Sequence, residues 1–164
     1  MKWDKVEREI QYLFHLNLRN MLIGQYTHEL DPKKRLTLPS KWRALLGKKV
    51  VVTNGLDNSL FVFPIKQWEE VATKLAQNSF GNRDSRDFNR FMLAHAFETD
   101  VDASGRILIP DTLKDFAKLN NKVVLAGMYS RIELWDEEEW KKYSAKTLGE
   151  ADALASKLSE LGII

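Results

Sequence analysis

The sequence predicts an α+β domain built from two similar halves of short strands, with helices packed outside them. The first observation behind this prediction is an internal repeat, because the residue pattern of 31–39 occurs again in 102–110. Both segments read Asp, three residues, Arg, and then apolar, any, apolar, Pro. The two Asp residues lie 71 positions apart. Two copies are too few for a solenoid, which needs about three or more, so they indicate a duplicated unit with pseudo-two-fold symmetry.

The second observation is that the repeat continues downstream of these segments. Residues 60–63 return as residues 132–135, and Trp68 returns as Trp140. These later pairs lie 72 positions apart, so the second copy carries one extra residue. The third observation is composition, since 164 residues that are 44% hydrophobic suit one compact domain of about 100–200 residues.

Composition also excludes several classes of protein. Cysteine is absent, which excludes a disulfide framework, a thiolate metal site and a cysteine nucleophile, and fits a reducing cytoplasm. No apolar run approaches the roughly 18 residues that would span a bilayer, so we expect no membrane partner. The net charge of +2 is too small to indicate nucleic-acid binding by itself, so a DNA-binding face requires local clustering of charge.

Residues 1–20 precede the repeat and are interpreted as an N-terminal extension. One helical stripe in this segment is formed by Trp3, Val6, Ile10 and Leu13. This spacing favours a short amphipathic helix. The sequence leaves open a second interpretation, in which Met21 is the natural start, because the repeat begins almost immediately after it.

The first repeat spans residues 21–76 and alternates strands with helices. Its predicted elements are strands over 22–30 and 36–38, a helix over 40–46, strands over 50–53 and 60–63, and a helix that contains Trp68, Val71 and Leu75. Pro32 fixes the turn after the first strand. Ser40 is expected to cap the first helix and Gly47 to end it.

A connecting segment over 77–93 begins as a polar loop and continues with helical spacing at Phe88, Phe91 and Met92. The second repeat covers residues 94–145 and follows the plan of the first. Its predicted elements are a strand ending near Val101, a strand over 107–109, a helix from Asp111, strands over 123–125 and 131–135, and a helix over 136–140. The last segment, 146–164, is predicted to be a C-terminal helix that closes the domain, on an apolar face formed by Ala151, Leu154, Leu158 and Leu161.

The two Asp-x-x-x-Arg loops are the candidate functional site. Arg35 and Arg106 each present a planar fork of donors, which can pair with guanine O6 and N7 in the major groove or hold a phosphate. Asp31 and Asp102 would repel phosphate, so we interpret them as loop-orienting residues that hold the Arg fork or the loop amides. In an arbitrary protein such a loop is a turn with a local ion pair, and it is the duplication that favours a function.

The first copy is more basic than the second. Residues 31–43 contain one Asp and five basic residues, Lys33, Lys34, Arg35, Lys41 and Arg43. The matching residues 102–114 contain two basic and two acidic residues. Lysines act as point charges on the DNA backbone, so we expect the first loop to dominate DNA contact and the second to be partly structural.

The doubled motif, each copy followed by Gly and a Trp-bearing helix, resembles the MraZ family of bacterial transcriptional regulators. The resemblance covers roughly residues 21–145. It implies a double-split β-barrel made of two interlocked AbrB-like (SpoVT-type) repeats, assembled into a ring-shaped homo-oligomer. It also implies a sequence-specific DNA-binding regulator, a repressor of the cell-division and cell-wall gene cluster, that binds short direct repeats in its own promoter.

By motif match, the resemblance carries the DNA-binding role to Arg35 and Arg106, each with the Asp four residues before it. The residue before the motif Arg is commonly Gly in this family, whereas here it is Lys34 in the first copy and Gly105 in the second. Because Lys enters the region of positive φ only at a cost, we expect the first loop to be shaped differently from the second.

Two alternative functions stay open at this stage. An AbrB-like antitoxin would sequester a toxin with its C-terminal region, and an oligomeric scaffold would assemble without affinity for DNA. An enzyme is not expected, because no serine has a recognisable nucleophile context, no Gly-rich phosphate loop is present, and no metal-ligand spacing links His15, His28 and His95. We therefore expect a cytoplasmic, nucleoid-associated DNA-binding protein without a metal or cofactor.

Overall fold

The computed structural model describes residues 21–78 and 80–164. The N-terminal extension, with its expected helix over 1–20, lies outside the described residues. Within the described part, strands and helices alternate in the order that the repeat predicted, and every strand pairing is antiparallel. This confirms the mixed α+β prediction. No helix in the described ranges is long and apolar enough to cross a membrane.

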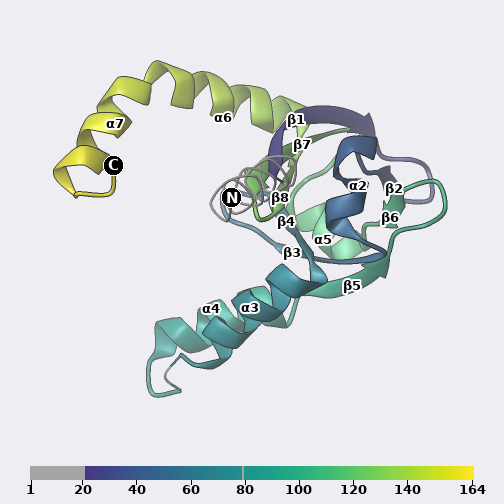
Figure 1. The fold of residues 1–164 in the computed structure, drawn as a ribbon, viewed down its shortest axis with the longest axis horizontal. Coiled ribbons are helices and arrows are strands. Elements are labelled where there is room, and N and C mark those ends of the chain that lie inside the picture. The colour runs from purple at the N-terminus through teal and green to yellow at the C-terminus, as the bar shows by residue number, and fades with distance from the viewer. Residues whose placement is uncertain (1–20, 79) are drawn as a thin grey trace, which may run out of the picture.

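The two halves of the chain use the same succession of elements. The first half contains β1 (Leu22–Glu29), β2 (Arg35–Thr37), α2 (Ser40–Leu46), β3 (Lys49–Asn54), β4 (Leu60–Pro64), α3 (Ile65–Ala76) and α4 (Arg83–Leu93). The second half contains β5 (Phe97–Asp100), β6 (Arg106–Leu108), α5 (Asp111–Phe116), β7 (Lys122–Tyr129), β8 (Ile132–Asp136), α6 (Glu137–Gly149) and α7 (Ala151–Glu160). In the first half α4 follows α3 within the segment predicted to connect the repeats, and with α3 it forms a hairpin that projects from the sheets (Figure 1).

The strands of the two halves are interlocked. The larger sheet has the order β1-β7-β8-β4-β3-β5, and the smaller one pairs β2 with β6. If each strand of the first half is exchanged for its counterpart in the second, the order of the larger sheet reads the same from the other end. The pairing therefore has the pseudo-two-fold symmetry that the repeat predicted, and β1 and β5 each pair with a strand of the opposite half.

The main hydrophobic core joins the larger sheet, the β2–β6 pair and the two short helices α2 and α5. Leu36 of β2 and Ile107 of β6 are directly paired and fully buried in it. Trp42 of α2 is also buried, and its ring meets Tyr26 edge-on with the ring centroids 4.9 Å apart. A second, smaller cluster on the other side of β4 holds the α3–α4 hairpin through Phe61, Phe63, Leu75 and Met92.

Helix α2 begins without the cap that the sequence suggested. Pro39, not Ser40, occupies the N-cap position of α2, and no side chain caps that end of the helix. The prediction for Ser40 was therefore wrong. Pro64 and Pro110 occupy the same position before α3 and α5, and a proline has no N–H to satisfy at a helix start. The predicted end of α2 is confirmed, since Gly47 has φ +75° and donates its N–H to the carbonyl of residue 43.

The C-terminal helix differs from its prediction in two respects. The predicted helical face over 148–162 is divided at Glu150, because α6 ends at Gly149 and α7 starts at Ala151. All residues of α7 are exposed, and α6–α7 extends away from the sheets, so it does not close the domain (Figure 1). Helical spacing correctly reported an apolar face, but spacing carries no information about what covers that face.

Gly127 of β7 lies close to the backbone of β1. A Cβ added there would lie 2.6 Å from the backbone carbonyl carbon and oxygen of Leu22. We expect Gly127→Ala to lower the free energy of unfolding by about 1–3 kcal/mol, as overpacking does elsewhere. Gly149→Ala is the matched control, because a Cβ there meets nothing within 4 Å and alanine favours a helix. Urea unfolding of both variants measures the difference, and two equally stable variants would contradict the close approach.

Candidate nucleic-acid interface

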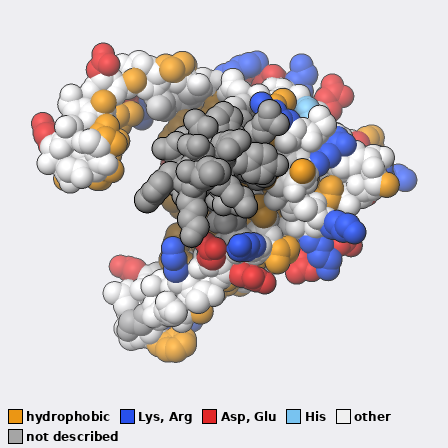
Figure 2. Space-filling model, in the orientation of Figure 1, with side chains coloured by type: hydrophobic (Ala, Val, Ile, Leu, Met, Phe, Trp, Pro, Cys, Tyr) orange, Lys and Arg blue, Asp and Glu red, His pale blue; other side chains and the backbone are white. Residues whose placement is uncertain are grey.

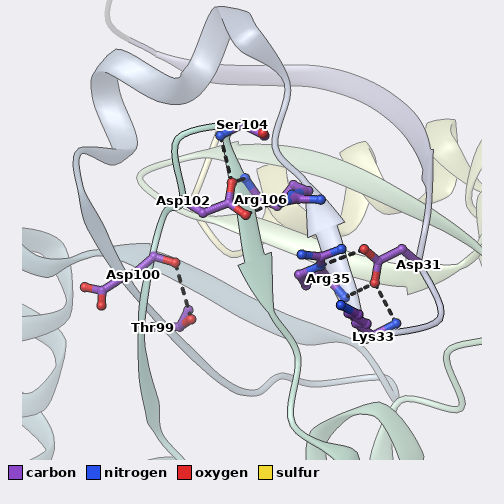
Figure 3. A network of polar contacts seen from close by, with 8 residues as sticks. All are labelled: Asp31, Lys33, Arg35, Thr99, Asp100, Asp102, Ser104 and Arg106. Carbon is purple, nitrogen blue, oxygen red and sulfur yellow. Dashed lines mark hydrogen bonds and ion pairs between the residues drawn. The ribbon is translucent and has the colours of Figure 1, made fainter.

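Asp31 organises the first loop through both of its carboxylate oxygens. Its Oδ1 accepts hydrogen bonds from the backbone N–H groups of Lys33 and Arg35, each at 2.9 Å. Its Oδ2 accepts from the Nε–H of Arg35 at 2.7 Å (Figure 3). One carboxylate thus fixes the loop backbone and one edge of the Arg35 guanidinium together.

The second loop repeats this arrangement bond for bond. Asp102 Oδ1 accepts from the N–H groups of Ser104 and Arg106, each at 2.9 Å, and Oδ2 accepts from Arg106 Nε at 2.8 Å. The residue before the Arg has positive φ in both loops, +60° at Lys34 and +75° at Gly105. The expectation that Lys34 would give the first loop a different shape was wrong, because the Asp hydrogen bonds hold both loops in one conformation.

The positive φ at Lys34 is expected to lower the free energy of unfolding by an amount that can be measured. Lys34→Gly and Lys34→Ala both remove its ion pair with Asp111, which is exposed and contributes little. Only glycine also relieves the left-handed backbone. We expect Lys34→Gly to be more stable than Lys34→Ala by about 1 kcal/mol. Chemical denaturation of the two variants tests this, and equal stabilities would mean that the loop does not strain a side-chain-bearing residue.

The same hydrogen bonds make both loops acid-sensitive. The backbone N–H of Arg35, assisted by its guanidinium, lowers the pKa of Asp31 below the ordinary value of 3.8. The N–H of Arg106 lowers the pKa of Asp102 in the same way. A carboxyl group whose pKa is lower in the folded state stabilises the fold above its ordinary pKa, and this contribution is lost as the pH falls through the lowered value. At neutral pH this contribution from Asp31 and Asp102 is therefore fully present.

The short ribbon made by β2 and β6 brings the two arginines together. Arg35 is paired with Leu108, and Arg106 with Thr37. Since Leu36 and Ile107 point into the core, these four side chains point outward, and the two arginines are diagonal neighbours on one face. Such neighbours lie about 7–8 Å apart. The two sites that are 71 positions apart in sequence thus form a single surface, with each Arg beside its own Asp (Figure 3).

Each arginine keeps part of its fork accessible. The side chains of Arg35 and Arg106 are 33% and 30% exposed. Within residues 21–78 and 80–164 their Nε–H groups are bound to Asp, and their Nη groups have no hydrogen-bond partner. The arrangement fixes the direction of each guanidinium while leaving its outer edge able to donate to a ligand.

The other predicted site residues lie in different environments around this ribbon. Lys33 and Lys41 are exposed. Lys34 forms its ion pair with Asp111 at the start of α5, so the opposite repeat compensates part of the charge of the first loop. Arg43 donates from Nε to the carbonyl of Leu38 at 3.0 Å, and its guanidinium fills the space where a Cβ of residue 105 would lie. Figure 2 shows Lys and Arg side chains, interspersed with Asp and Glu, over the end of the molecule that carries α2, β2 and β6.

Sequence reasoning missed two residues of this face, Thr37 and Leu108. Both follow a motif Arg by two positions, so they share its side of the strand. Strand alternation was the signal that would have found them, because the residue between is apolar in both copies. Leu108 is 43% exposed, which is unusual for a large apolar side chain flanked by two buried isoleucines. No group of three or more potential metal ligands occurs in the described part of the chain.

Comparison with known proteins agrees with the motif. The family model described as "MraZ protein, putative antitoxin-like" matches the chain twice, over residues 21–91 and 92–158. A protein of Caldicellulosiruptor saccharolyticus named "Transcriptional regulator MraZ" is 45% identical over 143 residues, which are 87% of this chain and all of the relative. Proteins of the same name from Thermoanaerobacter sp. and Oenococcus oeni are each 42% identical over the same shares of both chains.

These relatives carry the name of a non-enzymatic class, in agreement with the expectation that the chain is not an enzyme. Both family matches include one Asp-x-x-x-Arg loop and the elements that follow it. The doubled loop, the interlocked halves and the relatives together show that the chain belongs to the MraZ family.

Proposed function

We propose that the protein is a sequence-specific DNA-binding transcriptional regulator that contacts the major groove with the β2–β6 ribbon. The observation that carries the proposal is the pair of arginines on the outward face of that ribbon, each aligned by its own Asp. A two-stranded ribbon fits the major groove, and Arg is the commonest reader of guanine O6 and N7 there. The name of the relatives, transcriptional regulator, supports a role in regulating transcription.

The paired and unpaired cations have different tasks in this proposal. Each motif Arg has its charge compensated by an Asp, so it contributes more to base recognition than to general attraction. Lys33 and Lys41 are exposed and have no acidic partner among the described residues, so they are suited to phosphate contacts. Arg43 packs against Gly105 of the second loop and Lys34 forms an ion pair with Asp111, so we assign both residues secondary contacts with DNA.

The target that we propose is a set of short direct repeats in the protein's own promoter, through which it represses the cell-division and cell-wall gene cluster. Each protomer offers a ribbon of only three residues per strand, so one contact is weak. Several protomers in a ring-shaped homo-oligomer would bind tandem sites about one helical turn apart, and linking weak contacts raises the affinity. This function implies a cytoplasmic, nucleoid-associated protein.

An exposed apolar stripe on α6–α7 supports self-association. It includes Leu148, Leu154, Leu158 and Leu161, whose exposed fractions range from 37% to 76%. Figure 2 shows hydrophobic side chains along this projection, well away from the ribbon. An arm of this kind leaves the DNA-binding face open while it contacts a neighbouring protomer.

We further propose that the repeats over 21–76 and 94–145 form the double-split β-barrel of AbrB-like proteins. Supporting this, four strand pairings of the described residues join one half to the other, and the Leu30–Leu36 bridge links the end of β1 to the ribbon. The residues over 77–93, which hold α4, would then be a connection outside the barrel.

The antitoxin alternative remains a second candidate, because the family description contains the word and α7 offers an uncovered apolar face. An antitoxin would co-purify with a small partner protein bound to that arm. A scaffold would assemble without affinity for DNA. Both outcomes differ from those expected of a regulator.

The test of the proposed function is binding of the purified chain to the DNA upstream of its own gene, beside scrambled DNA of equal length, at two salt concentrations. We expect a preference for the upstream DNA, and an affinity that falls steeply with salt as phosphate contacts release counterions. Equal affinity for both DNAs would reduce the proposal to a basic surface. No binding at low salt would favour the scaffold or the antitoxin.

A further inference from the structure

The outward face of the β2–β6 ribbon is almost symmetric. The pseudo-two-fold axis passes between the paired residues Leu36 and Ile107, so it exchanges Arg35 with Arg106 and Thr37 with Leu108. The arginines and their Asp hydrogen bonds are the same on both sides. Among the four outward side chains, only the Thr37 and Leu108 pair differs between the two copies.

This difference matters because a symmetric DNA-binding surface does not distinguish the two orientations of its site on DNA. A protein surface with two-fold symmetry matches a palindromic site and binds it equally well in both orientations. Direct repeats have a direction, so a protein that recognises them needs a feature that breaks the symmetry. The outward face of the ribbon has one such feature, because the apolar Leu108 stands at the position equivalent to the polar Thr37.

Leu108 has the chemistry to recognise one particular group on DNA. Its side chain has no donor or acceptor, it is 43% exposed, and it lies directly across the ribbon from Arg35. The C5 methyl group of thymine is the apolar feature of the major groove, and apolar side chains contact it. Thr37 carries both a methyl group and a hydroxyl group, so it does not make the same strict choice.

The first loop, which carries Lys33 and Lys34 and is called the lysine loop below, lies at the same end of the ribbon as Leu108. The N–H of Ile109 donates to the carbonyl of Lys34 at 2.9 Å, which places the lysine loop beside the end of β6. At the opposite end, the N–H of Leu38 donates to the carbonyl of Gly105, in a loop without lysine. The side chain suited to a base contact, Leu108, and the lysines suited to phosphate contacts therefore lie at the same end of the ribbon.

We propose that Leu108 recognises a thymine methyl group next to the guanine read by Arg35, and that it gives the nearly symmetric ribbon one orientation on DNA. This inference rests on the proposed function and adds a specificity-determining residue to it. In each bound repeat, Leu108 and the lysine loop face one end, and Thr37 with the Ser104 loop faces the other.

The first test removes single methyl groups from the DNA. Each thymidine of the bound upstream site is replaced in turn by deoxyuridine, and affinity is measured for the wild type, Leu108→Ala and Thr37→Ala. At one position per repeat we expect the replacement to weaken the wild type about fourfold, the factor for burying one methyl group. The same replacement should leave Leu108→Ala unaffected and still weaken Thr37→Ala.

The second test reads the orientation directly. The chain has no cysteine, so Ser104→Cys allows an iron chelate to be attached to the second loop, where it cleaves nearby DNA. We expect cleavage at one end of each repeat. Adding Leu108→Thr, which copies Thr37 and suits a strand, should spread cleavage to both ends. Thermal unfolding of each variant checks that the fold is retained.

The outcomes separate this inference from the function on which it rests. Specific binding of the wild type with no sensitive thymine, or a sensitive thymine that stays sensitive in Leu108→Ala, would overturn the role of Leu108 and leave the regulator intact. Unchanged one-sided cleavage with Leu108→Thr would overturn its role in orientation. A wild type without preference for the upstream DNA would overturn the proposed function and this inference together.

Discussion

Replacing both Arg35 and Arg106 with alanine is expected to abolish the preference of the protein for its promoter over scrambled DNA. Each bidentate pair between Arg and guanine contributes about 1–3 kcal/mol of discrimination. Both arginines lie on the same outward face, so every ribbon in an assembly would lose both of its guanine contacts at once. The remaining lysines would still attract phosphate, so weak binding without sequence preference should survive. Competition between promoter and scrambled DNA measures the loss.

Two further variants show whether charge or shape is responsible. Arg35→Lys with Arg106→Lys keeps the charge but removes the planar fork, so we expect the preference to fall while the salt dependence stays close to that of the wild type. Arg83→Ala with Arg90→Ala removes the same charge from α4, where both arginines pair with Asp87 on a projection away from the ribbon (Figure 1). A double alanine variant of the ribbon that behaves like this α4 control would contradict the base-reading role.

Separating the two halves of the chain is expected to prevent either one from folding as a monomer. Of the six strand pairings in the described residues, four join one half to the other. The first half alone, residues 21–95, would keep only the β3–β4 pair, and Leu36 would lose its partner Ile107. We expect a cooperative unfolding transition to be absent from each dilute fragment and restored when the fragments are mixed.

A cut made after folding is the control for this experiment. A protease site placed between residues 94 and 96, in the short link between α4 and β5, allows the folded chain to be cleaved. The cleaved protein should stay assembled and keep its thermal transition, because the strand pairs and the core still hold the halves together. A single fragment that unfolds cooperatively as a monomer would show that the halves are independent domains.

Much of this architecture was predictable from the sequence, because the repeat fixes which elements correspond. Strand and helix positions in both copies follow from apolar spacing and from Gly and Pro at the turns. The juxtaposition of Arg35 and Arg106 was not predictable in that way. Local periodicity does not say which strand pairs with which, and β2 pairs with a strand 71 residues away.

The expectation about the shape of the first loop was wrong for a physical reason. The first loop was expected to differ because Lys34 disfavours positive φ, but the Asp31 hydrogen bonds and the Ile109 N–H fix that backbone. Counting charges along the sequence also leaves out Asp111 of the second repeat, which forms an ion pair with Lys34 of the first loop. Propensity describes one residue type by itself, whereas this loop is held both by its own Asp and by a partner distant in sequence.

The most direct test of DNA reading by the ribbon is methylation interference at guanine N7 in the promoter. Methylation of N7 blocks the major-groove edge that an Arg fork requires, and it leaves the minor groove and the phosphates unchanged. We predict that methylation of a few guanines, recurring with the spacing of the direct repeats, prevents binding of the wild type. Specific binding that no N7 methylation weakens would show that the β2–β6 ribbon does not read guanines in the major groove.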